Sequence, residues 1–195
     1  MRTRTVVLAL SLVFGLTLTG CASPSAGAGS SGSDVPAEPT AASESPVIAY
    51  PEAAAARAQA QAWVDSAVLP PEAVASENAP LAFGTYMAWP CGPIEKLEAY
   101  WTIPSMTVTQ AANWLMEHPP AGLVSTIGRP YEENPAIDGA SVGFIPQLDA
   151  QEGIVYSVAR NDTGVAVKAE VAALTASAVC PTPPGGGMWG APGQG

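Results

Sequence analysis

The stretch GIVYSVARNDTGVAVKAEVAAL, residues 153–174, predicts a β-hairpin. Apolar and polar positions alternate along both of its arms, which is the pattern of strands that bury one face. The buried face would take its side chains from both arms: Ile154, Tyr156, Val158, Val165, Val167, Ala169 and Val171. Between the arms, NDTG at residues 161–164 has the residue types of a tight turn. We therefore expect an antiparallel pair of strands.

Other elements can be placed around this hairpin. ASVGFIP (140–146) and the alternating KLEAYWTIP (96–104) are expected strands, and the alanine-rich segment 52–67 is an expected helix. A second helix follows Thr107, because Gln110 three residues later completes a capping box, and it ends at His118 before two prolines. The fold class is α+β: a small antiparallel sheet of about four strands with two helices packed on one face.

The N-terminus has the pattern of an export signal. Two arginines precede VVLALSLVFGLTL (6–18), thirteen uncharged residues, whereas a membrane span needs about 20 apolar residues. The tetrapeptide that follows, LTGC (18–21), resembles the lipobox of bacterial lipoproteins. The resemblance implies that Cys21 carries a diacylglyceryl group with fatty acids such as palmitate, and that cleavage before Cys21 makes it the new N-terminus. The protein would then be anchored to the cell membrane on its extracytoplasmic face.

Composition divides the rest of the chain. Residues 1–20 are the expected signal peptide, and residues 21–50 are the lipidated cysteine and a disordered tether rich in Ala, Ser, Gly and Pro. Some twenty-five tether residues would reach about 25–30 Å. Residues 51–180 are expected to form a single α+β domain, and residues 181–195, with clustered Pro and Gly, a disordered tail in which Trp189 is exposed and available to a partner.

Two cysteines remain when Cys21 carries lipid. Cys91 and Cys180 would lie outside the cytoplasm, where thiols oxidise, so one disulfide is the simplest expectation and two free thiols are the alternative. Its loop of some 90 residues corresponds to a stabilisation of about 4–5 kcal/mol. No CxxC motif is present and His118 is the one histidine, so we expect neither a metal site nor a cofactor.

The charge balance narrows the classes of partner. Removal of the signal peptide would leave five basic and seventeen acidic residues. Nucleic acid binding needs lysines and arginines that displace counterions, so we exclude nucleic acid as a partner. Attachment to the membrane would depend on the lipid rather than on a basic patch.

The folded part also carries a resemblance. The run YWTIPSMTVTQAANWLMEHPPAGL (100–123), together with VLPPEAV (68–74), is similar to uncharacterised secreted and lipoprotein domains of actinobacteria. In those domains an aromatic-rich strand ends in a proline and a helix ending in His-Pro-Pro follows. The resemblance spans about residues 55–175. It implies an α+β sheet domain and no particular chemistry.

Tyr100, Trp101 and Trp114 are the candidate ligand-binding residues, because clustered aromatic side chains can line a pocket for a sugar or an apolar ligand. The alternative for the same residues is packing in the core. His118 is the candidate general base of a hydrolase, but its place in the last turn of a helix favours a capping role.

The acidic pair Glu132 and Glu133 is the remaining candidate. Two carboxylates can act in acid–base chemistry or bind calcium, although adjacent residues in a proline-rich loop more often face water. No motif assigns a catalytic residue, so the favoured function is a non-enzymatic binding domain whose partner is an envelope protein or a cell-wall component. A carrier or sensor of a small apolar ligand is the first alternative, and a hydrolase that uses His118 is the second.

Overall fold

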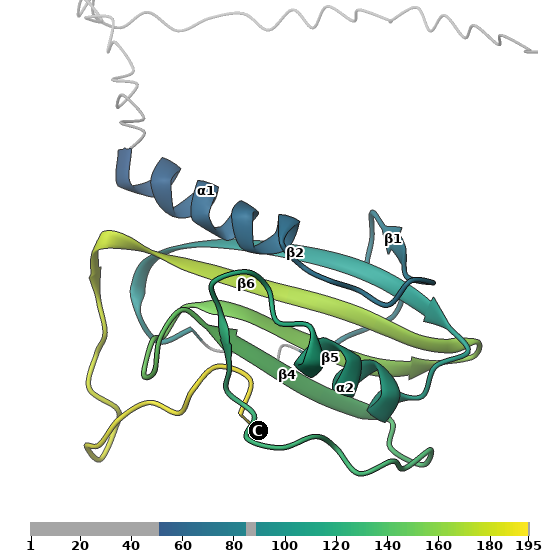
Figure 1. The fold of residues 1–195 in the computed structure, drawn as a ribbon. Helices are drawn as coiled ribbons and strands as arrows, with labels where there is room; N and C mark the ends of the chain where they lie inside the picture. Colours follow the sequence, from purple (N-terminus) through teal and green to yellow (C-terminus); the bar gives the residue numbers. More distant parts are fainter. Residues whose placement is uncertain (1–50, 85–88, 195) are drawn as a thin grey trace, which may run out of the picture. The chain divides into compact units, whose positions relative to one another are not determined.

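The computed structural model describes residues 51–84 and 89–194 (Figure 1). The predicted signal peptide, Cys21 and the tether lie outside the described residues. The helices and strands are α1 (Pro51–Asp65), β1 (Val74–Ser76), β2 (Gly92–Pro104), α2 (Val108–Glu117), β3 (Val124–Ser125), β4 (Gly139–Ile145), β5 (Gly153–Asn161) and β6 (Gly164–Val179). No helix within the described ranges combines the length and apolar character needed to cross a membrane.

The strands form one antiparallel sheet in the order β1-β2-β6-β5-β4-β3. The predicted hairpin is its centre, with Asn161 opposite Gly164 across a two-residue turn. The α+β class is confirmed, but the expected number of about four strands is wrong, since the sheet has six. The two extra strands, β1 and β3, are edge strands of three and two residues, too short to show an alternating pattern in the sequence.

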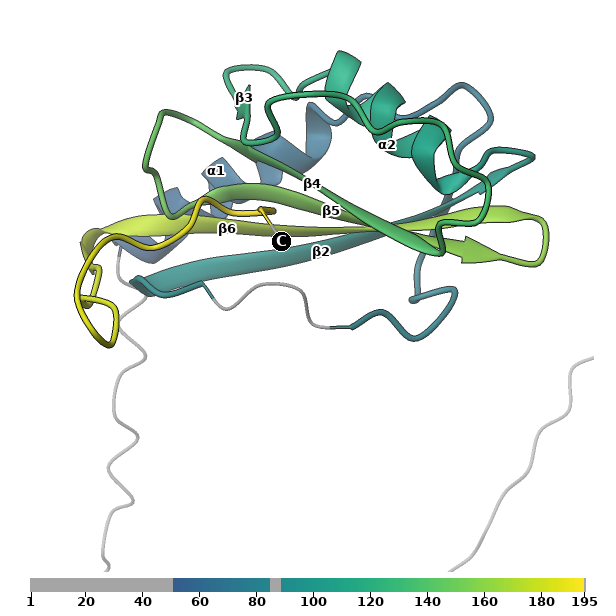
Figure 2. The same ribbon diagram turned by 90° about the horizontal axis from the view of Figure 1, so that it is seen from below.

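Both helices cover the same face of the sheet, as Figure 2 shows. Helix α1 packs over β2 and β6, and α2 packs over β4 and β5. The core between the helices and the sheet includes Ala60, Leu115, Phe144, Tyr156 and Val167. We call the opposite surface of the sheet the helix-free face; it carries the residues that alternate with these core positions.

Helix α2 has the ends that its sequence predicts. The Thr107 side chain accepts a hydrogen bond from the Gln110 backbone N–H, and the Gln110 side chain accepts one from the Thr107 N–H, so the capping box is complete. At the other end, the backbone N–H of His118 donates to carbonyls of the last turn. These caps determine where the helix begins and ends.

The C-terminal segment differs from the disordered tail that composition suggests. Residues 181–194 turn back under the sheet, where Pro192 and Gly193 are buried against Gly143 of β4. Thr126 Oγ1 donates to the Pro192 carbonyl at 2.8 Å, and Gln194 Nε2 donates to the Thr126 carbonyl at 2.7 Å. A Cβ at position 143 would overlap the Pro192 carbonyl, so a glycine there makes this docking possible.

Candidate functional site

A row of polar side chains crosses the helix-free face. Ser141, Ser157, Lys168 and Tyr100 are register partners on the neighbouring strands β4, β5, β6 and β2. Each alternates along its strand with residues that face the helices, so the pleat turns all four to the same side. Lys168 and Glu170 lie between the predicted buried positions Val167, Ala169 and Val171, but the sequence pattern does not show which residues of the other strands lie beside them.

Lys168 is the centre of a buried ionic cluster. Its Nζ lies 3.0 Å from Glu98 Oε1 and 3.1 Å from Glu170 Oε1. The side chains of Lys168 and Glu170 are 9% and 10% exposed, whereas that of Glu98 is 48% exposed. The Tyr100 hydroxyl donates a hydrogen bond to the other oxygen of Glu98. One ammonium and two carboxylates give the cluster a formal charge of −1.

The cluster shifts the pKa values of its members. Burial on its own lowers the pKa of Lys168, but the hydrogen bonds to Glu98 and Glu170 outweigh it and hold that pKa above 10.5. The hydrogen bond from Tyr100, with a smaller contribution from Lys168, lowers the pKa of Glu98, and the same bond to Glu98 raises the pKa of Tyr100. Lys168 is therefore protonated at neutral pH and is not a general base for the neighbouring Ser157.

A depression of about 460 Å³ adjoins this row. Phe83 and Tyr131 contribute aromatic walls, and Ser141 and Ser157 contribute hydroxyl groups to its lining. Both Oγ atoms are buried and have no hydrogen-bond partner among the described residues. The Tyr131 hydroxyl donates to the Ser141 carbonyl at 2.6 Å, so that ring is fixed at the edge of β4. The depression therefore combines apolar surface with two serines whose Oγ atoms are buried beneath that surface.

The structure does not bring the three predicted ligand-binding residues together. Trp101 pairs with Val167 and packs against the core, whereas its neighbour Tyr100 points to the helix-free face. Trp114 lies on α2, where its ring stacks on His118 at 4.1 Å between centroids. None of the three lines the 460 Å³ depression. Trp101 therefore has the core role that was the alternative for it.

The remaining candidates have structural contacts. His118 Nδ1 lies 2.8 Å from the Trp114 carbonyl oxygen, which fits a helix-capping role. Glu133 accepts a hydrogen bond from Thr107 Oγ1 at 3.0 Å, and Glu132 is exposed in the same loop. Within residues 51–84 and 89–194, no group of three His, Cys, Asp or Glu residues is placed to hold a metal ion.

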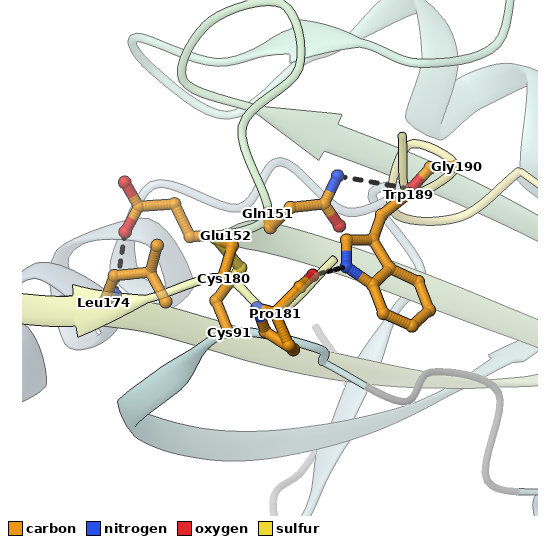
Figure 3. The surroundings of a disulfide bond; sticks show 8 residues. All are labelled: Cys91, Gln151, Glu152, Leu174, Cys180, Pro181, Trp189 and Gly190. Atoms are coloured by element: carbon orange, nitrogen blue, oxygen red, sulfur yellow. Dashed lines mark hydrogen bonds between the residues drawn. A yellow bond between two sulfur atoms is a disulfide. The ribbon is translucent and has the colours of Figure 1, made fainter. Parts of the chain in front are cut away.

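Cys91 and Cys180, the predicted pair, lie at disulfide distance with an S–S separation of 1.99 Å (Figure 3). The bridge joins the chain just before β2 to the chain just after β6, at one end of the sheet. Next to it, Trp189 Nε1 donates to the Pro181 carbonyl at 2.6 Å. The bridge therefore holds the start of the C-terminal segment against the sheet.

Comparison of the chain with protein-family models, with curated proteins and with solved structures finds no match. Inferences about function therefore depend on the residues and their geometry.

Proposed function

We propose that the protein is a lipid-anchored, extracytoplasmic binding protein, and that its folded domain binds a neutral, sugar-containing component of the cell envelope in the 460 Å³ depression. The observation that carries the binding site is a lining that brings Ser141 and Ser157 together with the rings of Phe83 and Tyr131. The two Oγ atoms are buried and have no hydrogen-bond partner among the described residues, and rotation of either serine side chain toward the depression would let its hydroxyl pair with a hydroxyl group of a ligand.

The other walls support a sugar rather than a wholly apolar ligand. Phe83 and Tyr131 offer apolar ring surface for the C–H faces of a sugar ring, while the two serines can donate and accept hydrogen bonds. The adjacent cluster around Lys168 has a formal charge of −1, so it would favour a neutral ligand over an anionic one. A protonated lysine beside Ser157 supports binding rather than nucleophilic catalysis.

Anchoring is the second half of the proposal, and it depends on the resemblance of residues 18–21 to a lipobox. Two acyl chains at about 0.8 kcal/mol per buried CH₂ are sufficient for stable attachment. The Cys21→Ser variant should leave the membrane fraction and appear in the soluble fraction. Retention of that variant in membranes, or an unmodified Cys21 thiol in the wild-type protein by mass spectrometry, would contradict the anchor.

The binding site is tested by calorimetric titration with neutral glycan fragments prepared from the host envelope. Ser141→Ala and Ser157→Ala should each weaken binding about five- to tenfold, since each removes one hydrogen bond worth roughly 1 kcal/mol. Neither should destabilise the fold, because neither hydroxyl has a hydrogen-bond partner among residues 51–84 and 89–194.

Ser76→Ala is the matched control for these variants. Ser76 faces the same side of the sheet from β1, opposite Tyr100, but does not line the depression. Its loss should leave the affinity unchanged. Equal weakening by all three variants, or no glycan binding by the wild-type protein, would overturn the proposed site.

A further inference from the structure

Exposed apolar side chains gather at one end of the sheet. Leu148, Val179, Met188 and Trp189 are 81%, 70%, 82% and 36% exposed. They come from three segments: the loop between β4 and β5, the end of β6, and the C-terminal segment. We call these four residues the apolar end patch. Several exposed apolar side chains at one end of a domain can mark a contact with another protein or with a membrane.

Specific bonds hold the patch in place. The C-terminal segment is fixed by the nearby disulfide, by the bond from Trp189 Nε1 to the Pro181 carbonyl, and by the bond from Gln151 Nε2 to the Gly190 carbonyl at 3.3 Å (Figure 3). A patch that is already ordered in the free protein loses little conformational freedom when it binds. Apolar residues on a disordered tail would lack this advantage.

The described chain begins at the same end of the sheet. Helix α1 starts at Pro51, and Ser177 Oγ near the end of β6 donates to Glu52 Oε2 at 2.7 Å. In Figure 1 the start of α1 and the end of β6 lie on the same side of the molecule. The thirty residues from Cys21 to residue 50 therefore join the domain next to the apolar end patch.

We propose that the apolar end patch docks onto the lipid surface to which Cys21 anchors the protein, an inference that rests on the proposed lipid anchor. A tether attached at this end makes docking an intramolecular event with a high effective concentration of lipid. Tryptophan suits the boundary between headgroups and acyl chains, and leucine and methionine suit the acyl region below it.

The chemistry of the patch also selects the kind of lipid surface. Its segments, residues 146–152 and 179–190, contain Asp149 and Glu152 and no lysine or arginine. Docking is therefore apolar rather than electrostatic. Zwitterionic lipid should be bound better than anionic lipid, and the preference should shrink at high salt, because salt screens the repulsion between exposed carboxylates and anionic headgroups.

The test attaches the chain from Cys21 onward to vesicles by its free Cys21 thiol, using a maleimide lipid in phosphatidylcholine. This linkage is independent of whether the cell lipidates Cys21, so a failure of docking is distinguishable from a failure of the anchor. Brominated lipids quench tryptophan that enters the bilayer boundary. The wild-type protein should show a quenchable fraction that disappears in Trp189→Phe.

The combined change Leu148→Asp and Met188→Asp should reduce quenching to the level of untethered protein. The matched control is Val68→Asp with Val74→Asp, two residues that are 44% and 61% exposed away from the patch, and it should leave quenching unchanged. Circular dichroism checks that each variant is folded. Absence of quenching in the tethered wild-type protein, or equal loss in the control, would overturn the docking proposal.

Discussion

Replacement of Lys168 by methionine tests the buried ionic cluster directly. The substitution keeps an unbranched side chain as far as Cε and removes the ammonium that pairs with Glu170 at 3.1 Å. The carboxylate of Glu170 is 10% exposed, and its Oε2 has no hydrogen-bond partner among the described residues, so it has little access to water as a replacement. Removal of one partner of a buried pair typically costs about 3–5 kcal/mol, and we expect a loss in that range. Glu98, which is 48% exposed, should be rehydrated and contribute little to the loss.

The assay is urea unfolding at pH 7 with the disulfide intact, and a double variant makes it decisive. Lys168→Met combined with Glu170→Met removes both buried charges, and such apolar replacements are often neutral or stabilising. The double variant should therefore recover most of the stability lost in the single one. A loss below about 1 kcal/mol for Lys168→Met, or a double variant no more stable than the single, would refute the reasoning.

Three further predictions follow from the same geometry. The added methyl group of Gly143→Ala would overlap the backbone of the docked C-terminal segment. Chymotrypsin should then cleave within residues 181–194 about tenfold faster, because one or two hydrogen bonds of roughly 1 kcal/mol each would be lost. Unchanged cleavage would contradict the docking. Cys91→Ser with Cys180→Ser opens a loop of 89 residues and should lower the free energy of unfolding by about 4–5 kcal/mol in urea; a loss under about 1 kcal/mol would count against this. Folding lowers the pKa of Glu98 below 4.5, so the contribution of Glu98 to stability is present above that pH and is lost as the pH falls through the folded-state pKa. Glu98→Gln should therefore reduce the loss of stability at acid pH. An unchanged loss would mean that other groups cause it.

The hairpin and both helices were predictable because their signals are local. Alternation along residues 153–174 and the turn between them fix which residues pair, so the Ser157–Lys168 contact follows from counting outward from Asn161 and Gly164. The capping box likewise lies within four residues. Local patterns of this kind survive folding because tertiary packing uses the same face that the sequence marks as apolar.

The rest of the site depends on pairings that no local pattern fixes. Tyr100 reaches Lys168 through the register of β2 and β6, and Ser141 reaches Ser157 across the seven-residue loop that joins β4 to β5. A slip of one residue in either register would turn the partner to the other face. Tyr100 and Trp101, by contrast, are adjacent in a strand and point to opposite faces, which the alternation of residues 96–104 already indicates.

The docked C-terminal segment shows a different limit of the sequence. Its composition of Pro and Gly is typical of disordered chain, because such residues bury little apolar surface. Here the contact is between backbones: Gly193 lies against Gly143, and carbonyls of residues 190 and 192 accept side-chain hydrogen bonds. Neither Gly143 nor Gly193 has a side chain, so the two backbones can approach closely. Composition alone does not reveal that these two distant glycines lie against each other.

The two proposals place the membrane and the ligand toward opposite ends of one sheet. Along β6, eleven residues separate Val179 in the apolar end patch from Lys168 beside the depression, which is about 35 Å at roughly 3.3 Å per residue. A domain docked through the patch with β6 along the membrane normal would hold the depression at about that height above the lipid surface. An undocked domain would have no fixed orientation relative to the membrane. Docking would thus give the binding site a defined direction away from the membrane, toward the envelope component that we propose it binds.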